Sequence, residues 1–81
     1  MSYVLYAREL VSLLEELTSI FAPGRVTVHA AEEGRLEVVV QAEGFEEEAL
    51  SIAEKVVKEV GVPCAEVKRH DTVVVISVPT L

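Results

Sequence analysis

Apolar residues recur every three or four positions in two stretches of the chain and every second position in four others. The first period is that of a helix buried along one side, and the second is that of a strand buried on one face. The pattern therefore predicts helices over residues 3–21 and 45–60. It predicts strands over residues 25–31, 36–42, 64–69 and 72–78.

The breaks between these segments carry the residues that end regular structure. Pro23 and Gly24 follow the first helix, and Gly61 and Pro63 follow the second, as is common after helix C-termini. Glu32-Glu33-Gly34 and His70-Asp71 are predicted turns, each of which closes a β-hairpin. One alternative stays open, because Tyr3-Val4-Leu5-Tyr6 also has strand propensity and residues 2–6 could form a short strand instead of helix.

The order α-β-β-α-β-β predicts a single α+β domain over residues 1–81. Two amphipathic helices need a surface on which to bury their apolar sides, and one face of a four-stranded, mainly antiparallel sheet provides it. The chain also divides into two αββ halves, 3–42 and 45–79, whose strand registers differ by a residue, so a duplication is one interpretation. The residues assigned to the helix-covered face are Val26, Val28, Leu36, Val38, Val40, Ala65, Val67, Val74, Ile76 and Val78.

The opposite face of the sheet is less polar than a monomer needs. Val73-Val74-Val75-Ile76 is apolar on both sides of the pleat, which is typical of a strand buried on both faces. One interpretation is that β-branched residues simply suit strands. The other is that the face is an interface, since contiguous exposed apolar patches mark association sites. The predicted interface residues are Thr27, His29, Val39, Gln41, Val73 and Val75.

The size of the chain favours the interface interpretation. At 81 residues with a single cysteine, Cys64, the domain has no intramolecular disulfide to stabilise it. Domains of this size depend on very good packing, a metal or a partner chain. We therefore expect a homo-oligomer, a dimer or higher, formed through the open sheet face, or a protein hetero-partner at that face.

The charge of the chain excludes other classes of partner. The formal net charge is −7, with 14 acidic residues against seven lysines and arginines. Nucleic-acid binding depends on cations that neutralise phosphates, and anionic membranes attract cations in the same way, so we expect neither partner. No apolar run is long enough to span a bilayer, and the N-terminus lacks the pattern of a signal peptide. A cytoplasmic location is therefore expected.

Candidate chemistry in the sequence is sparse. His70-Asp71 could form a metal-binding or acid–base pair, but the same two residues suit a turn. Cys64 could be a nucleophile if a histidine lay beside it, yet a lone cysteine most often packs as a small apolar residue. His29, Cys64, His70 and Asp71 lack the short spacings typical of zinc sites. Three glutamates at 46–48 fit the N-terminal end of a helix, where the dipole favours negative charge.

These patterns predict a small acidic assembly domain that self-associates, with no cofactor, no metal and no catalytic residue assigned. The alternative is a small-ligand-binding protein or minor enzyme, with a site between protomers near His29, His70 and Asp71. The chain contains no Asn, one Gln and 13 Glu, a composition reported for proteins of hyperthermophiles, so a thermophilic source is also expected.

Overall fold

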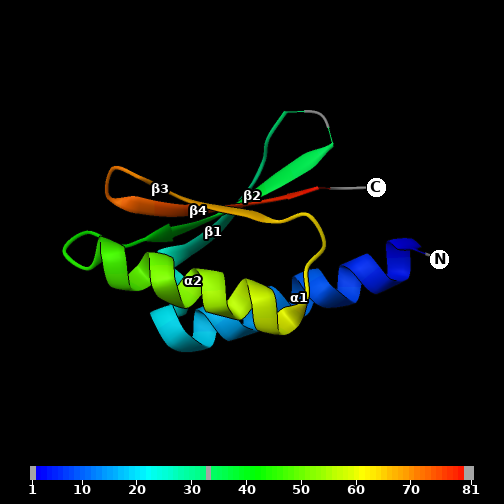
Figure 1. Cartoon of the computed structure of the whole chain (residues 1–81), viewed down its shortest axis with the longest axis horizontal. Helices are drawn as coiled ribbons and strands as arrows, with labels where there is room; N and C mark the ends of the chain where they lie inside the picture. The colour runs from blue at the N-terminus through cyan, green and yellow to red at the C-terminus, as the bar shows by residue number, and fades with distance from the viewer. Residues whose placement is uncertain (1, 33, 80–81) are drawn as a thin grey trace.

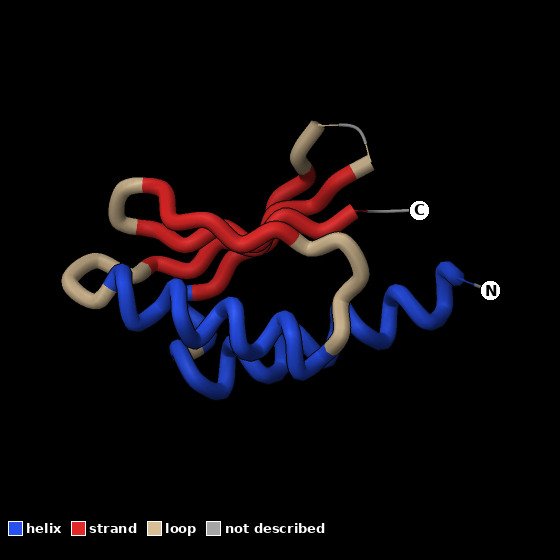
Figure 2. The backbone as a smooth tube through the Cα atoms, viewed as in Figure 1, coloured by secondary structure: helices blue, strands red, loops and turns tan. Residues whose placement is uncertain are grey.

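The computed structural model describes residues 2–32 and 34–79, with side chains described from residue 7 onward. It shows the predicted order of two helices and four strands, arranged as a helical layer beneath an antiparallel sheet (Figures 1 and 2). The strands lie in the order β1-β2-β4-β3, and all three neighbouring pairs are antiparallel. The predicted α+β two-layer fold is confirmed.

Helix α1 spans Ser2–Phe21, so the alternative of a strand over residues 2–6 is wrong. Leu13, Leu17 and Phe21 are buried at the expected spacing of four residues, whereas Ile20, three residues after Leu17 and so also within the helical period, is 47% exposed. The first turns of α1 project past the end of α2, to the right in Figures 1 and 2. The side chains of Tyr3 and Tyr6 lie outside the described residues.

A short 3-10 helix, Pro23–Arg25, leads into the first hairpin, which consists of β1 (Val26–Ala30) and β2 (Arg35–Gln41). Gly34 has a φ of 80° in the connection, a conformation that glycine adopts without steric cost. The predicted turn residue Glu33 lies outside the described residues. Strand β2 begins and ends one residue earlier than predicted.

Helix α2 spans Glu46–Val60. Phe45 precedes it, stacking on Phe21 with ring centroids 6.4 Å apart, and the Arg25 guanidinium lies 5.2 Å from the centroid of the Phe45 ring. Gly61 takes the left-handed conformation, and its amide donates to the carbonyl of Val57, which ends the helix as predicted.

The second hairpin consists of β3 (Glu66–His70) and β4 (Val73–Pro79). Strand β3 begins two residues later than predicted, because Cys64 has a φ of 56° and lies outside the strand. His70 is the last residue of β3 rather than part of the turn. The turn is Asp71-Thr72, with Asp71 at a φ of 59°, which Asp tolerates better than most residues.

The core lies between the helices and the two central strands. On the helix-covered face, Val38, Val40, Val74, Ile76 and Val78 of β2 and β4 are fully buried. Val28, which we also assigned to the covered face, is 44% exposed because β1 is an edge strand that the helices cover incompletely. The two hairpins meet through β2 and β4, as two αββ halves would, but one closes through four residues and the other through two.

Candidate functional site

The strand register places all six predicted interface residues on the face of the sheet opposite the helices, which we call the open face. Val39 lies opposite Thr27 on one side and Val75 on the other. Val73, two positions before Val75 on β4, lies opposite Gln41 on β2 and opposite His70 on β3. Since successive residues of a strand point to opposite faces, this register fixes which side chains share the open face.

Three valines form the centre of the open face, and we call Val39, Val73 and Val75 the valine patch. Val39 and Val75 are a directly opposed cross-strand pair, and Val73 is the next residue of β4 on the same face. All three are partly exposed in the single chain, whereas the valines on the other face of the same strands are buried. The patch therefore offers apolar surface that the described residues of one chain do not cover.

The open face is electrically balanced although the whole chain is acidic. The charged residues of the paired strands on this face are Arg35 and Lys68 against Glu37 and Glu66. The net charge of −7 therefore comes entirely from the rest of the chain, mainly from the two helices and the loops. Like-charge repulsion between two copies is consequently weaker when they approach through this face than when their acidic helices face each other.

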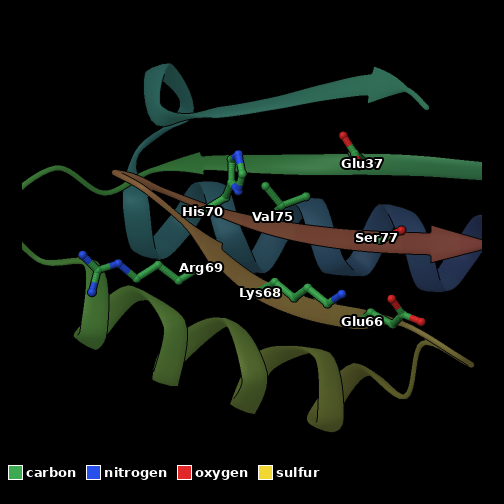
Figure 3. Close-up of a pocket in the computed structure, with 7 residues that line it drawn as sticks. All are labelled: Glu37, Glu66, Lys68, Arg69, His70, Val75 and Ser77. Atoms are coloured by element: carbon green, nitrogen blue, oxygen red, sulfur yellow. The ribbon is translucent and has the colours of Figure 1, made fainter. Parts of the chain in front are cut away.

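A hollow of about 400 Å³ lies on the open face over β2, β4 and β3 (Figure 3). The open-face side chains that line the hollow are Glu37, Val75, Ser77, Glu66, Lys68 and His70. Arg69 also borders the hollow, but its side chain extends toward α2, where it forms an ion pair with Glu47. Within the described part of the chain this is the only ion pair, so Glu37, Glu66 and Lys68 in the hollow have no partner of opposite sign within 4 Å.

Arg35 contacts Ser77, one of the residues that line the hollow. Its Nε donates to Ser77 Oγ at 2.6 Å, and its Nη2 donates to the backbone oxygens of Ser77 at 3.0 Å and Cys64 at 3.4 Å. The guanidinium thereby joins β2, β4 and the segment that precedes β3. Sequence reasoning did not single out Arg35 or Lys68, because isolated basic residues on strands show no pattern until the strand order is known.

The residues of the alternative ligand site do not converge within one chain. His29 lies on β1, where its Nε2 is 2.9 Å from Thr27 Oγ1, and His70 ends β3 at the opposite edge of the sheet. Three strand spacings separate these edges, which is about 14 Å. Asp71 lies in the turn, and the described residues contain no group of three His, Cys, Asp or Glu side chains placed to hold a metal ion.

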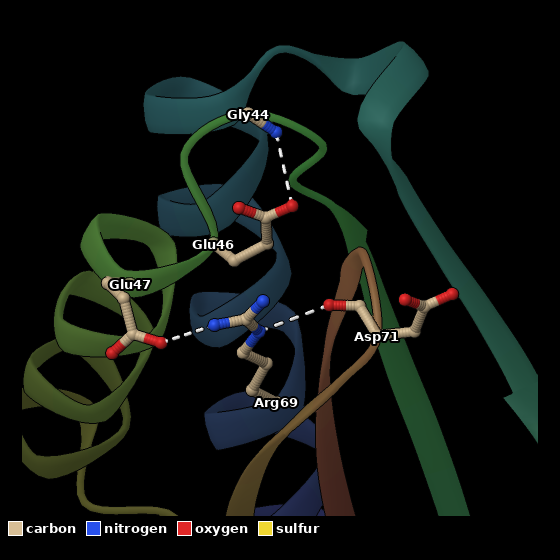
Figure 4. Close-up of polar contacts among 5 residues, drawn as sticks. All are labelled: Gly44, Glu46, Glu47, Arg69 and Asp71. Carbon is tan, nitrogen blue, oxygen red and sulfur yellow. Dashed lines mark hydrogen bonds and ion pairs between the residues drawn. The ribbon is translucent and has the colours of Figure 1, made fainter.

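A second polar cluster joins the β3–β4 turn to the start of α2 (Figure 4). The Arg69 guanidinium bridges the Glu47 carboxylate and the backbone oxygen of Asp71, the latter at 3.1 Å. The amide of Gly44 donates to Glu46 Oε2 at 3.2 Å. Hydrogen bonds from the backbone at Glu46 itself, and then from Gly44, lower the pKa of the Glu46 carboxyl below its ordinary value. These contacts anchor the hairpin to the helix and account for the acidic residues here without a ligand.

Comparison with protein-family models, with curated proteins and with solved structures finds no significant match. Neither helix, over the residues that the structure describes, is long and apolar enough to cross a membrane. The site therefore has to be interpreted from its own geometry.

Proposed function

We propose that this protein is a small assembly domain that binds a second copy of itself through the open face of its sheet. The observation that carries the proposal is the valine patch: Val39, Val73 and Val75 are contiguous and lie on a face that no described helix covers. A patch of this kind, ringed by polar side chains, has the arrangement of a protein interface, with an apolar centre and a polar rim.

Two further observations support self-association. The face is neutral while the rest of the chain carries all of the net negative charge, so two copies repel less in this orientation than when their acidic helices face each other. A twofold interface also requires one surface to complement itself. A central apolar patch flanked by Lys68 and Arg35 and by Glu37 and Glu66 meets that requirement, because each charge can approach an opposite charge of the second copy.

The proposal includes a cytoplasmic setting. Cys64 is exposed and free, and an exposed thiol remains reduced in the cytosol but is prone to oxidation outside it. The composition, poor in Asn and Gln and rich in Glu, supports a heat-tolerant source.

The direct test is Val75→Glu, which places a charge at the centre of the patch. We expect the dissociation constant of the oligomer to rise at least about a hundredfold, since desolvating an unpaired carboxylate is costly. Val11→Glu is the matched control, because Val11 is 53% exposed on α1 and receives the same charge. Analytical ultracentrifugation measures the oligomeric mass of both variants. If the Val75→Glu variant is as fully oligomeric as the Val11→Glu variant, the open face is not the interface.

A second candidate function is supported by the hollow, which is lined by His70 and by three charged side chains without an ion-pair partner, Glu37, Glu66 and Lys68. These groups could bind a small polar molecule, with His29 contributed by a second protomer because it lies at the far edge of its own sheet. Native mass spectrometry of freshly purified protein distinguishes this candidate, which predicts an added mass that His70→Ala removes. An oligomer with no added mass favours the assembly function.

A further inference from the structure

The two edges of the sheet differ in a way that the open face does not explain. Strand β3 has charged side chains at Glu66, Lys68 and Arg69, which is how natural proteins keep an edge strand from pairing with other chains. Strand β1, Val26-Thr27-Val28-His29-Ala30, has no acidic, lysine or arginine side chain. Four of its five residues are exposed, and Val26 is partly exposed. One edge of the sheet is thus protected by charge and the other is not.

The backbone groups of β1 that could pair are available. The amide of Ala31 donates to the carbonyl of Arg35 at 3.2 Å, so this amide points toward β2. The backbone groups of successive residues alternate along a strand, and Val28 and Ala30 therefore direct theirs outward. Val26 follows the same alternation: its amide donates to the oxygen of Pro23 rather than to β2, and its carbonyl points outward. The edge thus presents the amides of Val28 and Ala30 and three carbonyls.

We propose that a second copy of this chain pairs antiparallel with β1, so that two four-stranded sheets join into one sheet of eight strands. The twofold axis passes beside Val28, which lies opposite its own equivalent. In this register Val26 lies opposite Ala30 of the second copy, and Thr27 lies opposite its His29.

The register is self-complementary on both faces. On the helix side, Val28 meets Val28, and the side chain that is 44% exposed in one chain becomes buried in a cross-strand pair. On the open side, Thr27 meets His29, and the contact of 2.9 Å between these side chains within one chain shows that the pair can hydrogen-bond. Four backbone hydrogen bonds form: two between the Val28 residues, and one from each Ala30 amide to the opposite Val26 carbonyl.

Antiparallel pairing of β3 with a second β3 about a twofold axis is unfavourable, so the two copies should pair through β1 rather than through β3. A twofold axis beside the middle of β3 places Lys68 opposite a second Lys68, and like charges directly opposed on neighbouring strands are destabilising. The β1 contact is made by the edge of the sheet, whereas the open-face contact is centred on the valine patch; the two share only Thr27 and His29. This inference therefore does not depend on the proposed function. If both operate, the assembly has two kinds of twofold interface.

Hydrogen exchange at the amides of Val28 and Ala30, followed by NMR at low and high protein concentration, tests the contact directly. We expect both amides to become protected by about tenfold or more at high concentration, because free edge amides exchange rapidly and paired ones do not. Face-to-face contact through the valine patch leaves these amides in solvent. Rapid exchange of both at every concentration would overturn the inference.

Val28→Lys should abolish this protection at Ala30 and raise the dissociation constant of the edge contact at least about tenfold, because two lysines would then oppose each other on the axis. Val11→Lys places the same charge at a valine that is 53% exposed, against 44% for Val28, and should retain the protection. Val28→Pro is a second variant that removes the outward donor and leaves the β1–β2 ladder intact. Retained protection at Ala30 in folded Val28→Lys or Val28→Pro would also overturn the inference.

Val75→Glu separates the two proposals. If the edge contact is real, this variant loses association through the open face but keeps the protection of Val28 and Ala30. If Val75→Glu dissociates the oligomer while Val28→Lys leaves it unchanged, the open face stands as the interface and the edge contact is wrong. If Val75→Glu leaves the dissociation constant of the oligomer unchanged and the two amides remain protected, the edge contact is supported and association through the open face is contradicted.

Discussion

Val74 and Val75 are adjacent on β4 and point to opposite faces, so truncating each to alanine compares the two faces of one strand. Val74 is fully buried against the helices, whereas Val75 is partly exposed on the open face. Removing two methyl groups from a buried valine costs about 1.6 kcal/mol in transfer free energy. The cavity left behind adds roughly 1 kcal/mol, so Val74→Ala should destabilise the fold by about 2–3 kcal/mol.

The loss in free energy of unfolding caused by Val75→Ala should depend on the protein concentration. In a monomer, water fills the space left at a partly exposed site, and the cost should be about 1 kcal/mol or less. In an assembly that covers the patch, the site is buried and the cost should approach that of Val74→Ala. Urea unfolding at two concentrations a hundredfold apart measures this, since mass action alone changes the stability of a dimer by about 2.7 kcal/mol over that range.

One result would contradict the burial of Val75 in an assembly. If the unfolding midpoint of the wild-type protein is the same at both concentrations and Val75→Ala costs under about 1 kcal/mol at each, the open face is exposed to solvent in the native protein. Val74→Ala serves as the internal control, because its cost comes from the core of one chain and should change little with concentration.

Two further predictions concern the polar contacts. Arg35→Ala removes the guanidinium that holds Ser77, and we expect a loss of about 1–2 kcal/mol in the free energy of unfolding, whereas Arg8→Ala, at an exposed site on α1, should be near neutral by urea titration. An equal loss for both variants would show that the Arg35 contacts are not specific. Because its pKa is lowered in the folded state, Glu46 contributes stability that is present above its ordinary value of 4.5 and is lost as the pH falls through the folded pKa. The stability difference between the wild type and Glu46→Gln should therefore shrink on acidification below about pH 4.5, and a difference that grows would contradict the hydrogen bond from Gly44.

The periodicity of the sequence predicted the fold because each element is amphipathic with respect to a single core. Leu13 and Leu17 on α1 and Val38 and Val40 on β2 show the two periods clearly, and all four are fully buried. The strand prediction at Cys64 is wrong because the positive φ of this residue depends on how the chain enters β3, which no local pattern encodes.

The candidate site was predictable only in part. The alternation along β2 and β4 placed the valine patch on one face without knowledge of the strand order. The hollow required that order, because Lys68 and His70 reach it only when β3 pairs with β4, and Glu37 borders it only because β4 also pairs with β2. The exposure of Val28 likewise follows from the position of β1 at the edge, which the hydrophobic pattern does not specify.

Native mass spectrometry of the wild-type protein, purified without added metal, tests the central claim most directly, because it reports the number of subunits and any retained ligand together. The account predicts a dimer or a higher even-numbered oligomer whose mass is a multiple of 8.8 kDa, with no additional mass. A monomer at every concentration would contradict self-association through the open face and leave the valine patch without a second copy to cover it.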